Sequence, residues 1–163
     1  MSKATGGAHK CTSVGITFPR LLVSSTLLFL LFIGLFPMRV ANAEPPELTL
    51  TVADIDIPMV QGSGCWPLKN GEVLCHDTLA PPELLKSQTP VVVPSGSKVN
   101  LHFSYAPLSI SASQWMNGTP VKQDLTDHNT TLRLPTEQGT YIYDIFAKWK
   151  EGDVSYAFTV QVQ

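Results

Sequence analysis

The sequence predicts an all-β fold, an antiparallel β-sandwich, for residues 44–163. Apolar and polar residues alternate in several short runs, most clearly where Val99, Leu101 and Phe103 are separated by polar residues. Proline and glycine lie between these runs, as turns between short strands require. The only helical pattern after residue 43 is at residues 81–86, which begin with two prolines. Short strands, frequent turns and little helix together indicate a sandwich or a barrel.

The strands can be placed in order from their alternation and from the residues that end them. The run at 48–52 alternates apolar residues with threonine, and residues 54–57 either continue it or follow a turn. Pro58 marks an edge or a break there, because proline cannot donate to a sheet ladder. We expect further strands at residues 91–93, 99–105, 110–116, 130–134, 141–149 and 154–162.

The last two strands allow a prediction of their register. With a turn at residues 151–152, Trp149 lies opposite Val154 and Tyr143 lies opposite Val160. A slip of one residue would turn the apolar side chains of one strand into water, so the faces are strongly specified. The opposite face is expected to be polar, with Lys148, Ser155 and Gln161, and Phe146 is its one large exception. The expected buried face consists of Tyr143, Ile145, Tyr156, Phe158 and Val160.

The first 43 residues are expected to direct export and to stand outside the fold. Residues 21–36 are apolar almost without interruption, basic residues precede them, and no acid appears before Glu44. A basic start and an apolar core, followed by Ala-Asn-Ala at 41–43, are typical of a secretory signal peptide. Cleavage is expected between Ala43 and Glu44, and the mature protein is expected to be extracytoplasmic.

The same segment has an alternative interpretation as an uncleaved anchor helix. Extended to Met38, the apolar run approaches the roughly 20 residues that a spanning helix needs. Its basic end would stay inside, and the domain would be anchored at the outer face of the cytoplasmic membrane. Contact with a membrane is expected only through this segment. Cys11 precedes the apolar run, so it cannot be the first residue of a mature lipoprotein.

Charge excludes one class of partner. The whole chain has 11 basic and 13 acidic residues, a net charge of −2. Four of the 11 basic residues lie within residues 1–43, which leaves seven against 13 acids and a net charge of −6 for residues 44–163. An acidic domain without a basic cluster is a poor binder of nucleic acid, so we expect none as a partner.

Cys65 and Cys75 are predicted to form a disulfide across a hairpin. An even pair of cysteines in an exported chain indicates a disulfide. The pair Asn-Gly at 70–71 lies midway between them and is the preferred pair for a type I′ turn. The alternative is a metal or redox site that includes His76 and Asp77, but the spacing fits no C-x-x-C or zinc pattern. We therefore expect neither a metal nor a cofactor.

The C-terminal half resembles an immunoglobulin-like domain. The order of its last five strands is similar to the second half of that fold, with Trp115 as the core tryptophan of the third strand. Gly-Thr-Tyr at 139–141, followed by Tyr143, is similar to the tyrosine-corner region of the penultimate strand. There is no inter-sheet cysteine pair, and Leu101 or Phe103 would fill that space together with Tyr143. The resemblance implies an immunoglobulin-like β-sandwich.

The chain also resembles exported proteins of unknown function from Bacillus-type bacteria. The resemblance lies in the residues VQGSGCW at 60–66, APPELL at 80–85 and GTYIY at 139–143, and it covers most of residues 47–163. It implies a compartment and a fold, and it implies no activity.

No motif indicates catalysis. His76 and Asp77 are adjacent, and neighbours in a strand point to opposite faces. No serine lies in a nucleophile-elbow context, and His102 and His128 have no ligand spacing. The many acids are interpreted as a solvated surface, because Asp and Glu rarely bury unpaired. We expect no catalytic residues.

Trp66 and Trp149 are candidates for a binding surface. Trp66 lies in the stapled hairpin and Trp149 lies next to a turn. An aromatic side chain on a rigid hairpin suits recognition of a glycan or a protein, and the alternative is that each tryptophan covers an end of the sandwich. The sequence predicts an exported, non-catalytic binding or structural module of the cell envelope with an unknown partner. The alternatives are a small inhibitor or regulator of an exported enzyme, acting through the 65–75 hairpin, and an unrecognised small enzyme.

Overall fold

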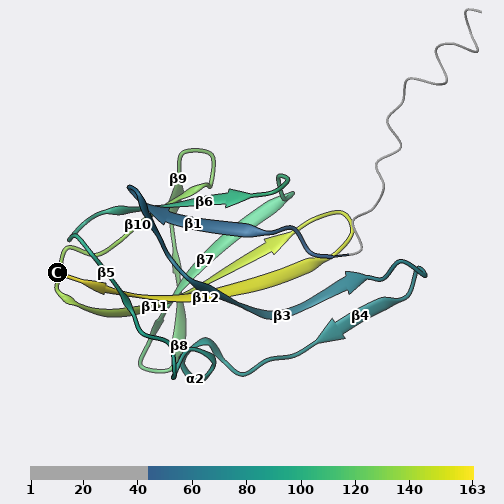
Figure 1. The fold of residues 1–163 in the computed structure, drawn as a ribbon, viewed down its shortest axis with the longest axis horizontal. Helices are drawn as coiled ribbons and strands as arrows, with labels where there is room; N and C mark the ends of the chain where they lie inside the picture. The colour runs from purple at the N-terminus through teal and green to yellow at the C-terminus, as the bar shows by residue number, and fades with distance from the viewer. Residues whose placement is uncertain (1–43) are drawn as a thin grey trace, which may run out of the picture. The chain divides into compact units, whose positions relative to one another are not determined.

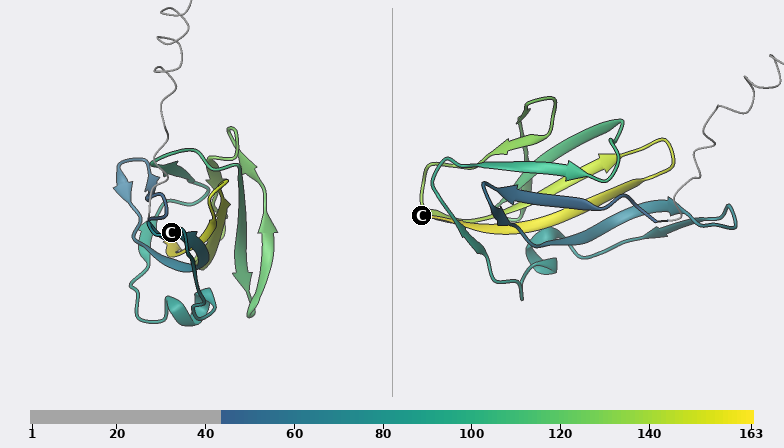
Figure 2. Two further views of the ribbon diagram at one scale, coloured as in Figure 1. Left: turned by 90° about the vertical axis from the view of Figure 1, so that its right-hand side faces the viewer. Right: turned by 45° about the horizontal axis from the view of Figure 1, so that its top comes forward.

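Two β-sheets pack face to face in the computed structural model, which describes residues 44–163 (Figures 1 and 2). The predicted signal peptide or anchor, residues 1–43, lies outside the described residues. Within residues 44–163, no helix is long and apolar enough to cross a membrane. The prediction of an all-β, sandwich-like fold is confirmed.

The smaller sheet has five antiparallel strands. In spatial order they are β2 (Ile55–Asp56), β1 (Leu48–Val52), β6 (Lys98–Phe103), β10 (Thr131–Arg133) and β9 (Leu125–Thr126). Buried and exposed residues alternate along β6, with Val99, Leu101 and Phe103 buried. The alternation in the sequence therefore correctly identified the face of this strand that meets the core.

The larger sheet has seven strands. Six follow one another in space: β4 (Val73–His76), β3 (Met59–Pro67), β12 (Asp153–Val162), β11 (Gly139–Lys148), β7 (Ser109–Met116) and β8 (Thr119–Gln123). The seventh, β5 (Val91–Val93), runs parallel to the last residues of β12. Strand β12 thus pairs with β3 along its first half and with β5 at its end.

Two strands were not predicted from the sequence. Strand β8 is exposed along nearly all of its length and contains Pro120. Its sequence therefore shows no alternation of apolar and polar residues and resembles that of a turn. Strand β9 has only two residues. Both lie at an edge of their sheet, where a strand has one neighbour and little burial to constrain its sequence.

The core fills the space between the sheets. Tyr143 of β11 stacks on Phe158 of β12 with 5.2 Å between ring centroids, and Tyr156 is fixed by a 2.7 Å hydrogen bond from its hydroxyl to the Pro46 carbonyl. The predicted buried face of the last two strands is confirmed. Its buried members are Tyr143, Ile145, Tyr156, Phe158 and Val160.

The register predicted for these two strands is wrong by two residues. Tyr143 pairs with Phe158 instead of Val160, and Ala147 pairs with Val154. A shift of two residues leaves every side chain on its face, because side chains alternate along a strand with a period of two. Face assignment and register are therefore separate predictions, and the sequence pattern decided only the first.

The shift has a cause in the turn. Trp149 leaves the strand, and its N–H donates to the Gly152 carbonyl at 2.8 Å, which makes the turn longer than predicted. Its indole packs edge-to-face on Phe103, with 5.4 Å between centroids. Trp149 is thus buried at the end of the core, outside the ladder, and Ala147 takes its place opposite Val154.

The outer face of β11 and β12 is less polar and more covered than predicted. The helix α2 (Pro81–Leu84) contacts β3, β11 and β12, and its C-terminal neighbour Leu85 is buried. On the outer face of β12, Ala157 and Thr159 are consequently buried. The helix was predicted at this position, but no pattern in its residues indicated that it would cover a sheet.

Trp115 does not occupy the core position expected from the immunoglobulin-like resemblance. It pairs with Ile142 on the outer face and is half-buried, whereas Ala112 and Gln114 of β7 face the core. Because β7 lies beside Ile145, which is itself fully buried, a small residue occupies the inward position opposite it.

Tyr141 ties the start of β11 to the loop that precedes it. Its hydroxyl donates a 3.0 Å hydrogen bond to the Glu137 carbonyl, four residues upstream.

Candidate functional site

The hairpin of β3 and β4 carries the predicted disulfide, which is confirmed. Cys65 lies directly opposite Cys75 in the ladder, and the two sulfurs are bonded. The turn differs from the predicted type I′. Only Gly71 of the Asn-Gly pair has a positive φ, and its N–H donates to the Leu68 carbonyl at 2.9 Å. The Asn70 side-chain oxygen accepts a hydrogen bond from the Glu72 N–H. The Leu68 N–H donates to the Glu72 carbonyl, so the loop between these two residues has three residues, with glycine in the left-handed position.

Trp66 and Trp149 do not form a binding surface, so that prediction is wrong. Their side chains are 5% and 2% exposed and meet edge-to-face with 5.6 Å between centroids. The Trp149 indole N–H donates to the Tyr105 carbonyl at 3.2 Å. Side chains alternate along β3, so Trp66 turns inward when Cys65 faces out. The alternative interpretation, that both tryptophans cover an end of the sandwich, is the correct one.

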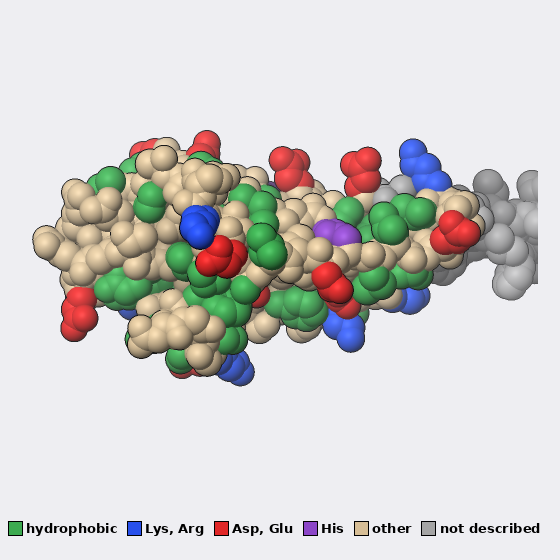
Figure 3. Space-filling view, turned by 90° about the horizontal axis from the view of Figure 1, so that it is seen from below, with side chains coloured by type: hydrophobic (Ala, Val, Ile, Leu, Met, Phe, Trp, Pro, Cys, Tyr) green, Lys and Arg blue, Asp and Glu red, His purple; other side chains and the backbone are tan. Residues whose placement is uncertain are grey.

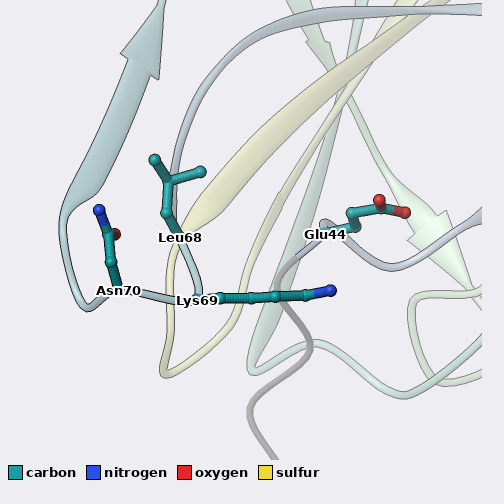
Figure 4. A pocket seen from close by; sticks show the side chains of 4 residues that line it. All are labelled: Glu44, Leu68, Lys69 and Asn70. Atoms are coloured by element: carbon teal, nitrogen blue, oxygen red, sulfur yellow. The ribbon is translucent and has the colours of Figure 1, made fainter.

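The hairpin nevertheless presents apolar side chains to solvent. Leu68 is 39% exposed, Val73 63% and Leu74 56%. In Figures 1 and 2 the hairpin extends beyond the turn that joins β11 and β12. Its turn lies beside Glu44, and together they border an open hollow (Figure 4). The residues lining it are Glu44, Leu68, Lys69 and Asn70.

A second hollow, which we call the acidic groove, lies between the base of this hairpin and the outer face of β11 and β12. It has a volume of about 330 Å³. The ladder between β3 and β12 is irregular between Val154 and Tyr156, and such bulges are frequent beside functional sites. The groove is lined by Ser63, Gly64, Cys65, Asp77, Asp144, Phe146, Asp153 and Ser155.

Glycines allow the two strands that border the acidic groove to approach closely. A Cβ atom on Gly62 would collide with the Ser155 hydroxyl, and one on Gly64 would lie 2.5 Å from the Asp153 carbonyl oxygen. A larger residue at Gly62 would displace the Ser155 side chain, and one at Gly64 would push β3 away from the backbone of β12. The sequence Gly-Ser-Gly at 62–64 therefore has a packing role at the base of the hairpin.

The electrostatics of the acidic groove are unusual at Asp144. Burial raises the pKa of this carboxyl to about 6, and a hydrogen bond with Ser155 acts in the opposite direction. Among the described residues, its Oδ1 is one of the few buried side-chain oxygens without a hydrogen-bond partner. Phe146 borders the same groove and is 40% exposed. The groove thus combines carboxylates with an aromatic ring, a composition that suits a cationic or hydrogen-bond-donating group.

The histidines do not assemble into a site. His76 Nε2 hydrogen-bonds with the Gly62 carbonyl at 2.8 Å, a contact that holds β4 against β3. His102 lies on β6 and His128 in the turn between β9 and β10. Within the part of the chain that the structure describes, no group of three or more His, Cys, Asp or Glu side chains is arranged to hold a metal ion.

Sequence reasoning missed the acidic groove. The sequence pattern places Phe146 on the outer face and Asp77 beside His76, and it does not single out Asp144. Their convergence depends on the pairing of β3 with β12, which lie about 90 residues apart in the sequence. The one available signal was Phe146, a large aromatic residue on a face that was otherwise predicted to be polar.

Comparison of the amino-acid sequence with known proteins gives no indication of the function. The chain matches no protein-family model, and no curated protein is detectably similar to it in sequence. The function must therefore be inferred from the side chains that the fold brings together.

Proposed function

We propose that this chain is an exported, non-catalytic binding module of the cell envelope, built on an immunoglobulin-like domain. Its strand order supports the fold type. In one sheet the order β1, β6, β10, β9 corresponds to strands A, B, E and D of an immunoglobulin domain. In the other sheet the order β12, β11, β7 corresponds to strands G, F and C, and β8 is an added edge strand. In this assignment the segment from β2 to α2 is an insertion between the first strand and β5, and it supplies the stapled hairpin.

The acidic groove carries the functional proposal. Three carboxylates, those of Asp77, Asp144 and Asp153, line one hollow together with the exposed ring of Phe146. A negative surface next to an aromatic ring is complementary to a cationic group, which the ring face and the carboxylates attract together. The partner is therefore an envelope protein with an exposed basic segment, or a glycan that carries amino groups.

Chemical-shift mapping tests the groove. The exported protein is titrated with oligolysine and, separately, with an oligosaccharide of glucosamine. At least one of the two should shift the amide resonances around Phe146 and Asp153. Binding should weaken several-fold in Asp77→Asn/Asp153→Asn and stay unchanged in the matched control Asp54→Asn/Asp56→Asn, which alters exposed acids of the other sheet. Shifts spread evenly over both sheets would contradict the proposal.

Export is tested separately. The mass of the protein recovered outside the cytoplasm should correspond to a chain that begins at Glu44 if the signal peptide is cleaved. Recovery of the full-length chain, and only in membranes, would support the anchor alternative instead. The disulfide is compatible with either extracytoplasmic location, since disulfides persist in oxidising compartments.

The two alternative functions have weaker support. A compact, charge-poor hairpin tip carrying Trp66 would favour an inhibitor, but Trp66 is buried and the turn carries Lys69 and Glu72. A cleft with several converging acids or histidines would favour an enzyme. The acidic groove has such acids, but its volume is at the lower end of the range for ligand pockets and leaves little room to enclose a substrate.

A further inference from the structure

Strand β4 (Val73–His76) is one edge of the larger sheet, and in the described chain it pairs with β3 alone. The Leu68 N–H donates to the Glu72 carbonyl at 2.6 Å, so these two residues form a hydrogen-bonded pair at the end of the hairpin. Such pairs alternate with non-hydrogen-bonded pairs along an antiparallel ladder. Cys65 and Cys75, which lie opposite each other with 4.0 Å between their Cα atoms, accordingly form a non-hydrogen-bonded pair.

This alternation determines which backbone groups of β4 are free. Leu74 and His76 belong to hydrogen-bonded pairs, so their N–H and C=O groups point to β3. The N–H and C=O groups of Val73 and Cys75 point away from the sheet, and no hydrogen bond within residues 44–163 occupies them. Two donors and two acceptors in a row on an open edge are a template for a further strand.

The other edges of the two sheets are protected against such pairing. Strands β2 and β9 have only two residues each. Strand β8 contains Pro120 and Lys122, and Pro90 and Pro94 flank β5. Short strands, proline and lysine are common means by which an edge avoids another strand. Strand β4 contains neither proline nor lysine, and Figure 3, which views the molecule from the side where β4 lies in Figure 1, shows hydrophobic side chains at the surface there.

We propose that β4 pairs with β4 of a second copy of this chain, antiparallel and about a two-fold axis at Leu74. In this register Val73 of each copy exchanges two N–H···O=C hydrogen bonds with Cys75 of the other copy, so all the free groups are satisfied. An axis at Val73 or at Cys75 would pair only one of these residues within the strand. The larger sheets of the two copies then join into one continuous sheet.

The side chains that meet in this register are complementary. Leu74, which is 56% exposed, lies opposite Leu74 of the second copy in a non-hydrogen-bonded pair, where side chains are closest. Val73, which is 63% exposed, lies beside the Cys65–Cys75 disulfide of the second copy. Glu72 lies opposite His76, so no acid faces another acid. The backbone alone would accept any strand, and this self-complementarity of the side chains indicates a second copy.

The pairing is expected to be reversible. Two strands of four residues form a small contact, and contacts below about 1,200 Å² are typical of weak, transient complexes. Each domain also has a net charge of −6 over residues 44–163, so two copies repel each other at a distance. The free backbone groups and the apolar side chains of β4 must therefore supply the attraction.

The pairing has a consequence for the acidic groove. Antiparallel strands of one sheet are related by an axis perpendicular to that sheet, so the outer faces of both copies point to the same side. The two grooves, each bordered by Asp77 and Asp153, then lie on one face of the dimer. A ligand with repeated cationic groups engages both grooves at once, which raises its apparent affinity. This consequence rests on the proposed function, whereas the pairing of β4 does not.

Disulfide capture in the full-length chain tests the pairing without any ligand, whether or not residues 1–43 are cleaved. Directly opposed, non-hydrogen-bonded residues have Cα atoms about 4.5 Å apart, a separation that a disulfide spans. Leu74→Cys should therefore give a covalent dimer, linked from position 74 to position 74, on non-reducing gels and in peptide mass maps. Val121→Cys, 42% exposed on the opposite edge of the same sheet, should give several-fold less dimer. Equal yields, no dimer at all, or a link from position 74 to a different protein would overturn the proposal.

Val73→Pro provides a second test that needs no added thiol. Val73 begins β4 and its N–H points away from β3, and proline is tolerated in an edge strand at such a position. Sedimentation velocity is measured on the exported form, or in detergent if the apolar run is retained. The wild type should dimerise as its concentration rises, and Val73→Pro should dimerise several-fold more weakly with a nearly unchanged unfolding midpoint. A wild type that stays monomeric, or a Val73→Pro variant that dimerises equally well, would refute the β4 pairing.

Discussion

The two long hairpins of this domain are stabilised in different ways. The β11–β12 hairpin lies in the middle of the larger sheet, and five consecutive residues of β12, from Tyr156 to Val160, are buried. The β3–β4 hairpin lies at the edge, and every residue of β4 is exposed. The first is stabilised by burial on both faces, whereas the second has a disulfide and one inward tryptophan.

The difference shows where this fold can accept functional residues. Strands in the middle of a sheet are constrained by every neighbour, so their sequence serves packing. An edge hairpin that is covalently closed can expose Val73 and Leu74 and border an acidic groove without loss of its conformation. Closing a loop of this length contributes about 2–3 kcal/mol in the chain-entropy model, which compensates for the burial that β4 lacks.

The largest effect is expected in the central hairpin. Phe158→Ala should lower the free energy of unfolding by about 3–5 kcal/mol, because it removes a fully buried ring that stacks on Tyr143. Urea denaturation of the variant and the wild type measures this loss in the free energy of unfolding. Because small domains have only about 5–15 kcal/mol in total, the variant can be close to unfolding. Phe146→Ala, on the exposed face of β11, is the matched control and should cost much less; similar costs at the two positions would refute the face assignment.

The next effect is expected in the edge hairpin. Cys65→Ser/Cys75→Ser should lower the free energy of unfolding by about 2–3 kcal/mol. Amide hydrogen exchange should quicken in β4 and remain slow in β11 and β12, since only β4 depends on the covalent link. In the native protein both cysteines should resist alkylation until a reductant is added. Free thiols before reduction would show that the edge hairpin is held by other contacts.

A smaller and pH-dependent effect is expected at Asp144, where the two hairpins meet. Its pKa is raised from 3.8 to about 6 by burial. The folded state therefore holds this proton more tightly than the unfolded state, and stability falls as the pH rises from about 3.8 to about 6. Asp144→Asn should raise the thermal midpoint at neutral pH and change it little at about pH 3.5. Asp54→Asn serves as an exposed control, and an equal gain at both pH values would contradict the burial argument.

The smallest effect is expected for the exposed apolar residues of the edge hairpin. Leu74→Ser should change the free energy of unfolding by no more than about 0.5 kcal/mol, as at ordinary surface sites. The denaturant midpoint of unfolding is measured for this variant and for the wild type, and the two values should nearly coincide. A loss of several kcal/mol would mean that Leu74 supports the fold, and the hairpin would then have no surplus apolar surface to offer a partner.

The amino-acid sequence by itself determined the fold class, the helix position, the disulfide and the buried faces of the central strands. These features depend on local patterns: alternation with a period of two, proline and glycine between runs, and an even pair of cysteines within residues 44–163. The face of β12 is an example, since no odd shift of register could keep Tyr156 and Phe158 inside.

Tertiary structure alone decided the register of the last hairpin, the positions of the three tryptophans and the acidic groove. An alternating pattern is unchanged by a shift of two residues, so it could not select the pairing of Tyr143 with Phe158, which accompanies the longer turn at residues 149–152. The groove needs β3, β11 and β12 side by side, and no local pattern encodes the meeting of Asp77 with Asp144. Long-range pairing is set by the free energy of the whole core, which a single segment of sequence does not contain.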